Sequence, residues 1–388
     1  MNTKEQRAQE LRSGRYLIAI LAAMLHQKAV PPLPEGMTWQ MVYNVARYHS
    51  LDSMVLAGVE PMVRQADPAL YADWNKRRSM NMVQTLTQIS EQQRLVEAFS
   101  KAELPVLLVK GGALRVLYPS PNYRQMSDVD ILTSKEDTAR AEKLLVELGY
   151  QEPEKDRAQE NETSFFLPPY MSVELHNSPV NPQDPRAPYY EDIWTKTVEN
   201  PALPHVFHLR TEDEYLYLLV HFIKHYDDAG IGIRQVMDVY LYQQAYGSSM
   251  DAAYLAKETA ALGIDTMRTA IEQLAQLCFS GEEPPEEPDA LVREMEEVCL
   301  LSGIYGSTQS RSVRMMQKVQ QAGGNGAGWK LRYLWRRLFP PLEELYRRYP
   351  KARRAPWLVP YYWLCRLLDG DYWKKRFLNE IAGMHDEK

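Results

Sequence analysis

Residues 106–132 read VLLVKGGALRVLYPSPNYRQMSDVDIL, and this stretch decides the fold. The apolar run VLLV ends at a lysine and two glycines, which predicts a strand followed by a sharp turn. The segment ALRVLY then predicts a short helix, a proline-rich loop follows, and DVDIL predicts a second strand. Strand, turn, helix and strand in this order indicate a compact α/β unit.

The two aspartates of DVDIL are the first candidate site residues. Residues two apart in a strand project from the same face, so Asp128 and Asp130 point together while Val129 and Ile131 point to the core. Two carboxylates on one face form either a metal site or a pair of ordinary solvent-facing acids on an edge strand. The two aspartates alone do not decide between these interpretations.

A later strand candidate, MSVELHN at residues 171–177, supplies a third acid. It alternates apolar Val173 and Leu175 with polar Glu174 and His176, so Glu174 joins the two aspartates if the strands are neighbours in one sheet. Clustered acids repel one another unless a cation neutralises them, and hard oxygen ligands select Mg²⁺ or Mn²⁺. We therefore expect all three acids on one side of the sheet, and a raised pKa for at least one of them without metal. His176 shares the face of Glu174, where it either orients an acceptor or a metal-bound water or is simply hydrogen-bonded.

The residues Lys110, Gly111 and Gly112 form the second part of the predicted site. Glycines allow the backbone to approach a ligand closely, and free amides at a helix start favour phosphate. The spacing of a P-loop is absent, so the glycine pair alone fits a plain turn equally well. Together with the acids, however, it would position a polyphosphate beside divalent cations, which is what phosphoryl transfer requires.

Composition and cysteine usage exclude several classes of protein. The chain of 388 residues has 45% hydrophobic and 25% charged residues and a net charge of −6, which is typical of a globular protein and not of a disordered or histone-like one. Its three cysteines are far apart and unpaired in sequence, which favours neither a disulfide framework nor a thiolate metal site. The apolar run at residues 17–25 is too short to cross a bilayer and predicts a core helix. We expect no transmembrane segment and a cytoplasmic location.

The periodicity divides the chain into three regions. Apolar spacings of three and four predict helices up to about residue 101, the β-rich unit follows, and a proline-rich stretch from Asn177 to Pro204 predicts an extended connection. Helical periodicity returns at Thr211 and continues nearly to the end. We therefore predict an α+β fold, in which a small mixed-sheet core at 102–204 is flanked by an N-terminal helical region at 1–101 and a C-terminal helical domain at 205–388.

Basic residues near the predicted core are candidates for triphosphate contacts. Arginine offers a bidentate fork to phosphate; Arg124 precedes the acids directly, whereas we expect Arg115 on a solvated helix face. The helix LVHFIKHY places His221, Lys224 and His225 on one side. We expect His221 or Lys224 to contact nucleotide or acceptor, with salt bridges between helices as the alternative.

The C-terminal segment 311–377 holds sixteen lysines and arginines against four acids, interleaved with tryptophans and tyrosines. Such a segment would suit RNA or an anionic surface. It would equally suit an amphipathic helical cap in which arginine stems cover apolar surface. We favour the cap, so a nucleic-acid partner is possible but not favoured.

These motifs together carry a resemblance to a known family. VKGGALRVLYP, YRQMSDVDIL, VELH, LVHFIKHY and RQVMDVYLY resemble the uncharacterised bacterial type 5 nucleotidyltransferase family, which has the fold of the DNA polymerase β superfamily. The resemblance covers roughly residues 35–280. Position 112 is a glycine where the wider superfamily commonly has a serine.

The resemblance implies transfer of a nucleoside monophosphate from an NTP to an acceptor hydroxyl. It implies two Mg²⁺, with Mn²⁺ as a possible substitute, held by three catalytic acids: Asp128, Asp130 and Glu174. Glu174 is either a metal ligand or the base that deprotonates the acceptor. The predicted nucleotide-binding residues are Lys110, Gly111, Gly112, Arg124, His221 and Lys224. The acceptor is a small molecule, a protein side chain or an RNA end, and the alternative function is a catalytically degenerate nucleotide-binding or adaptor module of the same fold.

Overall fold

The computed structural model describes residues 3–151, 161–227, 230–282, 287–303 and 356–368, together with Leu342 and Leu345. The chain divides into two compact units. The first contains residues 1–226 and 231–304, and the second contains residues 227–230 and 305–388. In the second unit the structure describes a short 3₁₀ turn, Pro356–Leu358, and the helix α16, Val359–Leu368. Most of the basic segment 311–377 lies outside the described residues, so its predicted role stays a prediction.

A mixed six-stranded sheet forms the centre of the first unit, in the order β3-β4-β2-β1-β6-β5. Its two middle strands, β2 and β1, are antiparallel, while β2 pairs in parallel with β4 and β1 pairs in parallel with β6. The strands are β1 (Val106–Val109), β2 (Val129–Leu132), β3 (Glu162–Leu167), β4 (Met171–His176), β5 (Thr197–Glu199) and β6 (Val206–Leu209). The stretch 106–132 therefore supplies the two central strands, and the predicted α+β class is confirmed.

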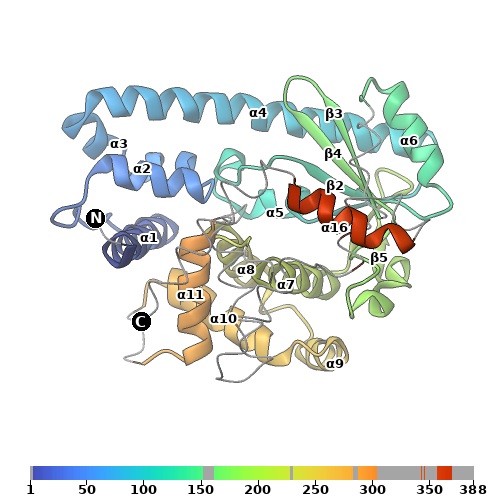
Figure 1. Cartoon of the computed structure of the whole chain (residues 1–388). Coiled ribbons are helices and arrows are strands. Elements are labelled where there is room, and N and C mark those ends of the chain that lie inside the picture. The colour runs from blue at the N-terminus through green and yellow to red at the C-terminus, as the bar shows by residue number, and fades with distance from the viewer. Residues whose placement is uncertain are drawn as a thin grey trace, which may run out of the picture. The chain divides into compact units, whose positions relative to one another are not determined.

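Helices cover both faces of this sheet (Figure 1). Alternate residues of the central strands separate the two cores: Leu108 and Ile131 pack in one cluster with side chains of α4 (Pro68–Lys101) and α6 (Thr138–Glu147). Leu107 and Leu132 pack in the other cluster with side chains of α7 (Thr211–Asp227) and α8 (Ile233–Tyr246). The period of two along each strand thus assigns one set of side chains to each helical layer.

The flanking regions are helical, as the sequence predicts. The N-terminal region contains α1 (Thr3–Leu25), α2 (Trp39–Tyr48), α3 (Asp52–Ala66) and α4. After α7 and α8 follow α9 (Ala252–Leu262), α10 (Asp265–Phe279) and α11 (Ala290–Ser302). In the part of the chain that the structure describes, none of the helices combines the length and apolar character needed to cross a membrane.

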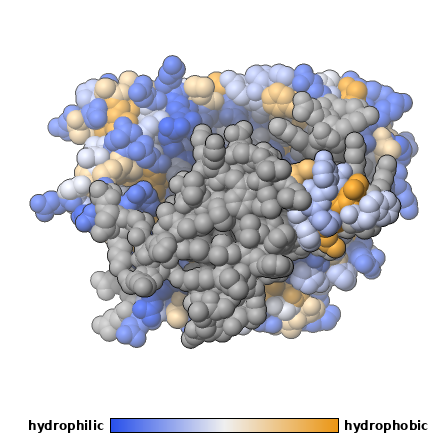
Figure 2. All heavy atoms as spheres, in the orientation of Figure 1, coloured by the Kyte–Doolittle hydropathy of each residue, from blue (hydrophilic) through white to orange (hydrophobic). Residues whose placement is uncertain are grey.

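The longest helix, α4, has two different faces. Leu95, Val96 and Phe99 near its C-terminal end are buried against the sheet. Leu86 and Val83 lie on its other face and are more than half exposed. Figure 2 shows hydrophilic and hydrophobic residues mixed along the upper edge of the molecule, where α4 runs.

The sequence missed half of the strands. β3, β5 and β6 were not predicted, and the segment 177–204, predicted as an extended connection, contains two 3₁₀ turns, Ala187–Tyr190 and Ile193–Lys196, followed by β5. β5 and β6 are short strands at one side of the sheet; β6 pairs with β1, which is distant in the sequence, and β5 pairs with β6. β5 has only three residues, and ETSFFL and VFHL show no regular alternation of polar and apolar residues, so periodicity did not indicate these strands. The predicted domain boundaries stay a prediction.

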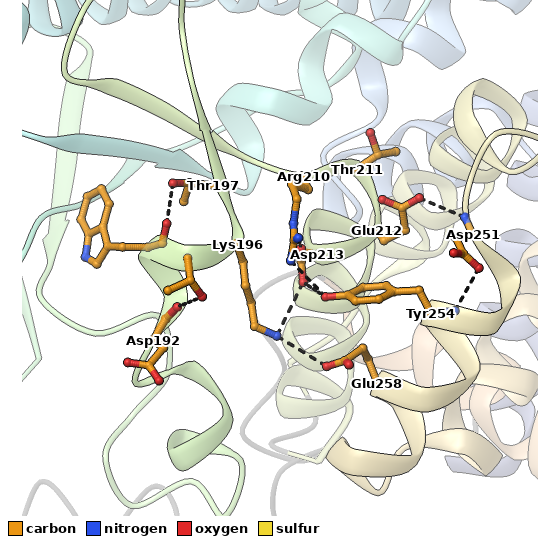
Figure 3. A network of polar contacts seen from close by, with 12 residues as sticks. Asp192, Lys196, Thr197, Arg210, Thr211, Glu212, Asp213, Asp251, Tyr254 and Glu258 are labelled. Atoms are coloured by element: carbon orange, nitrogen blue, oxygen red, sulfur yellow. Dashed lines mark hydrogen bonds and ion pairs between the residues drawn. The ribbon is translucent and has the colours of Figure 1, made fainter.

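A polar network attaches this side of the sheet to the helical layer (Figure 3). Asp213, in the first turn of α7, accepts hydrogen bonds from Arg210 Nε and from Tyr254 Oη on α9, both at 2.7 Å. Lys196 Nζ, from the turn before β5, lies 3.6 Å from Asp213 Oδ1 and 3.6 Å from Glu258 Oε2. The Asp213 side chain is only 2% exposed, so its charge depends on these partners.

We predict that Asp213→Asn destabilises the protein. The substitution keeps the size of the side chain but removes the carboxylate of Arg210, while Lys196 keeps Glu258 as a partner. We expect the free energy of unfolding to fall by about 2–3 kcal/mol, less than for a fully buried ion pair, because Arg210 is partly exposed. Urea unfolding measures the change. Asp192→Asn, at an exposed position in the same region, is the control and should change stability by less than about 0.5 kcal/mol. If the two variants were equally stable, Asp213 would not stabilise the fold through its ion pairs.

Candidate active site

Asp130 lies in the middle of the sheet on the face that turns towards α7. Its neighbours Val129 and Ile131 are fully buried against the α4 layer, so the alternation of β2 places Asp130 on the opposite face. Asp130 is itself only 6% exposed, whereas Asp128 lies just before the strand and is partly exposed. The predicted alternation is thus present for Val129, Asp130 and Ile131, while the shared face of Asp128 stays a prediction because Asp128 lies outside β2.

Glu174 lies on the same side of the sheet as Asp130. The two residues are register partners on the parallel strands β4 and β2. One donor atom each from Asp130, Glu174 and His176 can be chosen so that all lie within 4.8 Å of one another. An ion of the size of Mg²⁺ or Mn²⁺ can be reached by ligands with this spacing, and carboxylate oxygens are the donors that such ions prefer. The residues therefore fit a divalent cation.

Two basic groups contact Asp130. Lys110 Nζ lies 2.5 Å from Asp130 Oδ1, and His176 Nε2 lies 2.9 Å from the same oxygen. Burial of Asp130 opposes its charge, but the Lys110 ammonium and the hydrogen bond from His176 lower the pKa of Asp130 well below its usual range. In the same way, burial opposes the charge on Lys110 while Asp130 raises its pKa. The pair is therefore charged across the physiological pH range.

The pKa of Glu174 shifts in the opposite direction from that of Asp130. Its burial raises its pKa to about 7, and the negative charges of Asp128, Asp130 and Glu162 act in the same direction, against a hydrogen bond from His176. The expectation that one acid of the cluster has a raised pKa is confirmed. A carboxyl group with this pKa exists in both protonation states near neutral pH, which suits a proton acceptor or a ligand that ionises when a cation arrives.

The backbone before the glycine pair has an unusual conformation. Lys110 has φ 57° and ψ −123°, in a region that residues with a side chain rarely adopt. Such a conformation costs on the order of 1–3 kcal/mol and persists only where surrounding contacts hold it. It turns the chain from β1 into the short helix α5, Gly111–Leu114. The strain is located at the residue whose side chain contacts Asp130.

The two glycines fit closely against neighbouring side chains. A Cβ atom on Gly111 would lie 2.7 Å from Arg124 Nη1 and 2.7 Å from Met126 Cε. A Cβ atom on Gly112 would lie 3.1 Å from Gln92 Oε1, which leaves little room for the serine that is common here in the wider superfamily. Packing therefore favours glycine at position 111, whereas a small shift of Gln92 would accommodate a side chain at position 112; the role of both glycines in binding nucleotide stays a prediction.

The arginines near the acids are buried. Arg124 donates from Nε and Nη2 to the two carboxylate oxygens of Asp238 on α8, each at 2.8 Å, and both side chains are less than a tenth exposed. Tyr118 Oη also donates to Asp238, at 2.8 Å. Arg115 is 4% exposed and donates to Gln88 at 2.6 Å, so the expected solvated position of Arg115 was wrong. Arg115 turns inward because the short helix that carries it packs between α4 and α8, which the local sequence pattern could not reveal.

An open hollow lies beside the acids, between the sheet and α7. The sheet side contributes Lys110, Glu162 and His176, and α7 contributes His221 and Lys224. The remaining lining residues are Asn161, Pro179, Val180, Asn181, Asp184, Tyr217 and Val220. His221 and Lys224 thus line the hollow, whereas Gly111, Gly112, Asp128, Asp130 and Glu174 are not among its lining residues.

The histidines of α7 contact each other. His225 Nε2 lies 3.0 Å from His221 Nε2, a hydrogen bond in which one ring donates and the other accepts. Burial lowers the pKa of both, and nearby positive charges act in the same direction; the pKa of His225 falls to about 4 and that of His221 lies well below its usual value. Both rings are therefore neutral at pH 7. Lys224, between them in sequence, is exposed.

Sequence reasoning missed Glu162 and Tyr217, which both line the hollow. Glu162 is the register partner of His176 across the antiparallel pair β3–β4, and its Oε2 lies 3.8 Å from His176 Nδ1. The β-branched and aromatic residues of ETSFFL, which favour a strand, and the spacing of four between Tyr217 and His221 were the signals that could have identified them.

A comparison with known protein families identifies the class of protein to which the chain belongs. The family model for uncharacterised nucleotidyltransferases matches residues 35–280, and the chain belongs to this family. It is accordingly a nucleotidyltransferase. No curated protein matches the chain.

Two solved structures of the same enzyme are similar in part. The crystal structure of ANT(2″)-Ia in complex with adenylyl-2″-tobramycin is 14% identical, with a TM-score of 0.34, and the match covers 47% of this chain and 99% of that one. The solution structure of the antibiotic-resistance factor ANT(2″)-Ia is also 14% identical, with a TM-score of 0.34 and coverages of 48% and 96%.

We predict that Glu174 makes the metal-free protein less stable as pH rises. A group whose pKa is higher in the folded than in the unfolded chain stabilises the fold at low pH, and this stabilisation is lost between its unfolded pKa of 4.5 and its folded pKa of about 7. The loss should reach about 3 kcal/mol, at roughly 1.4 kcal/mol per pKa unit.

Glu174→Gln should remove this decrease, and urea unfolding at several pH values with a chelator present measures it. Glu136→Gln, at an exposed position, is the matched control and should keep the wild-type slope. An unchanged slope in Glu174→Gln would show that another group is responsible.

A second prediction concerns Arg124. Lysine cannot reproduce the bidentate contact with Asp238, so Arg124→Lys should lower the free energy of unfolding by about 2–4 kcal/mol. Arg140→Lys is the control, because Arg140 pairs with Asp137 on the surface and should contribute less than about 1 kcal/mol. Thermal and urea unfolding without nucleotide measure both. If Arg124→Lys were as stable as wild type, the arginine would be available for a ligand instead of the fold.

Proposed function

We propose that this nucleotidyltransferase moves a nucleoside monophosphate from an NTP to a hydroxyl group of an acceptor, with Mg²⁺ as the cofactor and Mn²⁺ as a possible substitute. One observation carries the proposal: Asp130 and Glu174 are register partners on the same face of the sheet, and Asp128 is two residues before Asp130, just outside β2. Carboxylates placed together in this way repel one another, and a cation bridged by phosphate oxygens relieves the repulsion.

Asp128, Asp130 and Glu174 would hold the cation, and His176 would orient Asp130 through its 2.9 Å contact. When bound, the cation neutralises charge that develops on the phosphate oxygens. The protein's own contribution is to fix the carboxylates on two central strands, so that little reorganisation is needed when the substrate enters.

The reaction exchanges one phosphorus–oxygen bond for another. The acceptor oxygen forms a bond to the α-phosphorus, the bond between the α-phosphorus and its bridging oxygen to the β-phosphate breaks, and pyrophosphate leaves. The acceptor proton must pass to a base. Glu174, with a pKa of about 7, is suited to accept it, while its position also permits direct contact with the cation.

The hollow beside the acids would hold the NTP phosphates or the acceptor. Lys110, His221 and Lys224 line it and can donate to anionic or hydroxyl oxygens. The glycine turn and Arg124 would complete the nucleotide contacts predicted from the sequence. A small molecule, a protein side chain and an RNA end all offer the required hydroxyl group, and a cytoplasmic location suits all three.

The test measures whether a label on the α-phosphate of the NTP is transferred to an acceptor. Purified protein with Mg²⁺ and each NTP labelled at the α-phosphate should transfer label to an acceptor in a cell extract. Asp128→Asn should reduce the transfer by roughly 100-fold or more, since loss of groups that merely support metal ligands already costs about 10- to 100-fold. Asp73→Asn, an exposed aspartate on α4, is the control and should transfer label normally.

Two outcomes would contradict the proposal. If wild type and Asp128→Asn neither bind NTP nor label any acceptor, the nucleotidyl-transfer function is wrong. If NTP binds without metal dependence and no product forms over hours, the chain is a nucleotide-binding or adaptor module of the same fold.

A further inference from the structure

Lys110 contacts the carboxylate that the proposed metal site needs most. Its Nζ lies 2.5 Å from Asp130 Oδ1, and the Lys110 and Asp130 side chains are 18% and 7% exposed. The ammonium therefore lies inside the acid cluster, where a cation bridging the acids would be expected, and water screens the contact little.

The backbone conformation of Lys110 is unfavourable for a residue with a side chain. The positive φ of Lys110 favours glycine, and the chain has glycines at the next two positions, yet a residue with a long side chain occupies the strained one. A conformation that is unfavourable for lysine is retained together with the contact to Asp130. Because both side chains are mostly buried, the contact differs from an ordinary surface ion pair.

Lys110 also lines the hollow in which the substrate would bind. It lines the hollow together with His221 and Lys224, so its ammonium faces the acid cluster and the hollow at once. An ammonium group has three donors, and Asp130 uses one of them. The other two donors can form hydrogen bonds to phosphate oxygens. Bridging a carboxylate and a phosphate is the geometric role that a metal ion has in a two-metal site.

We propose that Lys110 is a built-in cation that replaces one of the two divalent ions, so that this enzyme uses a single metal ion. The inference rests on the proposed function, because it assumes that the acids bind a cation beside an NTP. Asp128 and Glu174 would hold the single ion together with the side of Asp130 that is turned away from Lys110.

The charges of the cluster agree with a single ion. A second divalent ion would have to share Asp130 with an ammonium 2.5 Å away, and like charges at that separation repel strongly in a partly buried site.

The experiment counts metal ions instead of turnover. Mn²⁺ bound per chain is measured by electron paramagnetic resonance and equilibrium dialysis, with a saturating non-hydrolysable ATP analogue. Wild type should bind one ion in the ternary complex. Lys110→Met, which keeps the length of the side chain but removes the charge, should bind two. Lys110→Arg keeps the charge and should bind one.

Lys101→Met, at an exposed position at the end of α4, is the matched control and should bind one ion. Two ions on wild type, or one ion on a folded Lys110→Met, would overturn the inference while leaving the proposed function intact. If Lys110→Met does not fold by circular dichroism, the counts for wild type and Lys110→Arg decide: one ion on each supports the inference, and two on either overturns it. No Mn²⁺ on wild type with the analogue bound would instead overturn the metal dependence of the proposed function, and the inference with it.

Discussion

A charged carboxylate lies in the middle of the sheet, and much of the surrounding structure serves to keep it there. Asp130 is almost fully buried, and burying an unpaired carboxylate would cost more free energy than a domain can easily spare. The end of β1 brings Lys110 to it, and β4 brings His176. Each partner comes from a different strand, so the carboxylate is satisfied only when the three strands have the observed register.

The helical regions also hold the loop that leads into the acids. Gln125 donates to the buried carboxylate of Asp52 on α3 at 2.8 Å, Gln88 of α4 donates to the carbonyl of Met126 at 3.0 Å, and Arg124 is paired with Asp238 on α8. Three helices from both flanking regions therefore contact consecutive loop residues just before Asp128. Such a second layer of contacts fixes the position of catalytic groups, and it gives the helical regions a part in positioning the site as well as in forming the core.

The sequence predicted what depends on local periodicity. The alternation in DVDIL and MSVELH placed Asp130 and Glu174 on polar faces, and the structure joins those faces because β2 and β4 are parallel neighbours. Features set by distant pairing could not be predicted in this way. Arg115 looked solvated because its buried partner Gln88 is on another element, and Glu162 became part of the site only through its pairing with His176. Short strands such as β5 likewise form by pairing with a neighbouring strand, and their own residues do not indicate a strand.

The close fit around Gly111 has a consequence for how relatives of this chain should be interpreted. A side chain at that position would press on Arg124 and Met126 and so disturb the ion pair with Asp238 that attaches the core to α8. Selection for a stable fold would keep this glycine even in a relative that had lost its chemistry. The glycine pair is therefore a poor marker of activity in genome surveys. Asp128 and Glu174 are better markers, because neither is part of a described ion pair with lysine or arginine, and a chain without a cation to bind would gain stability by replacing Glu174.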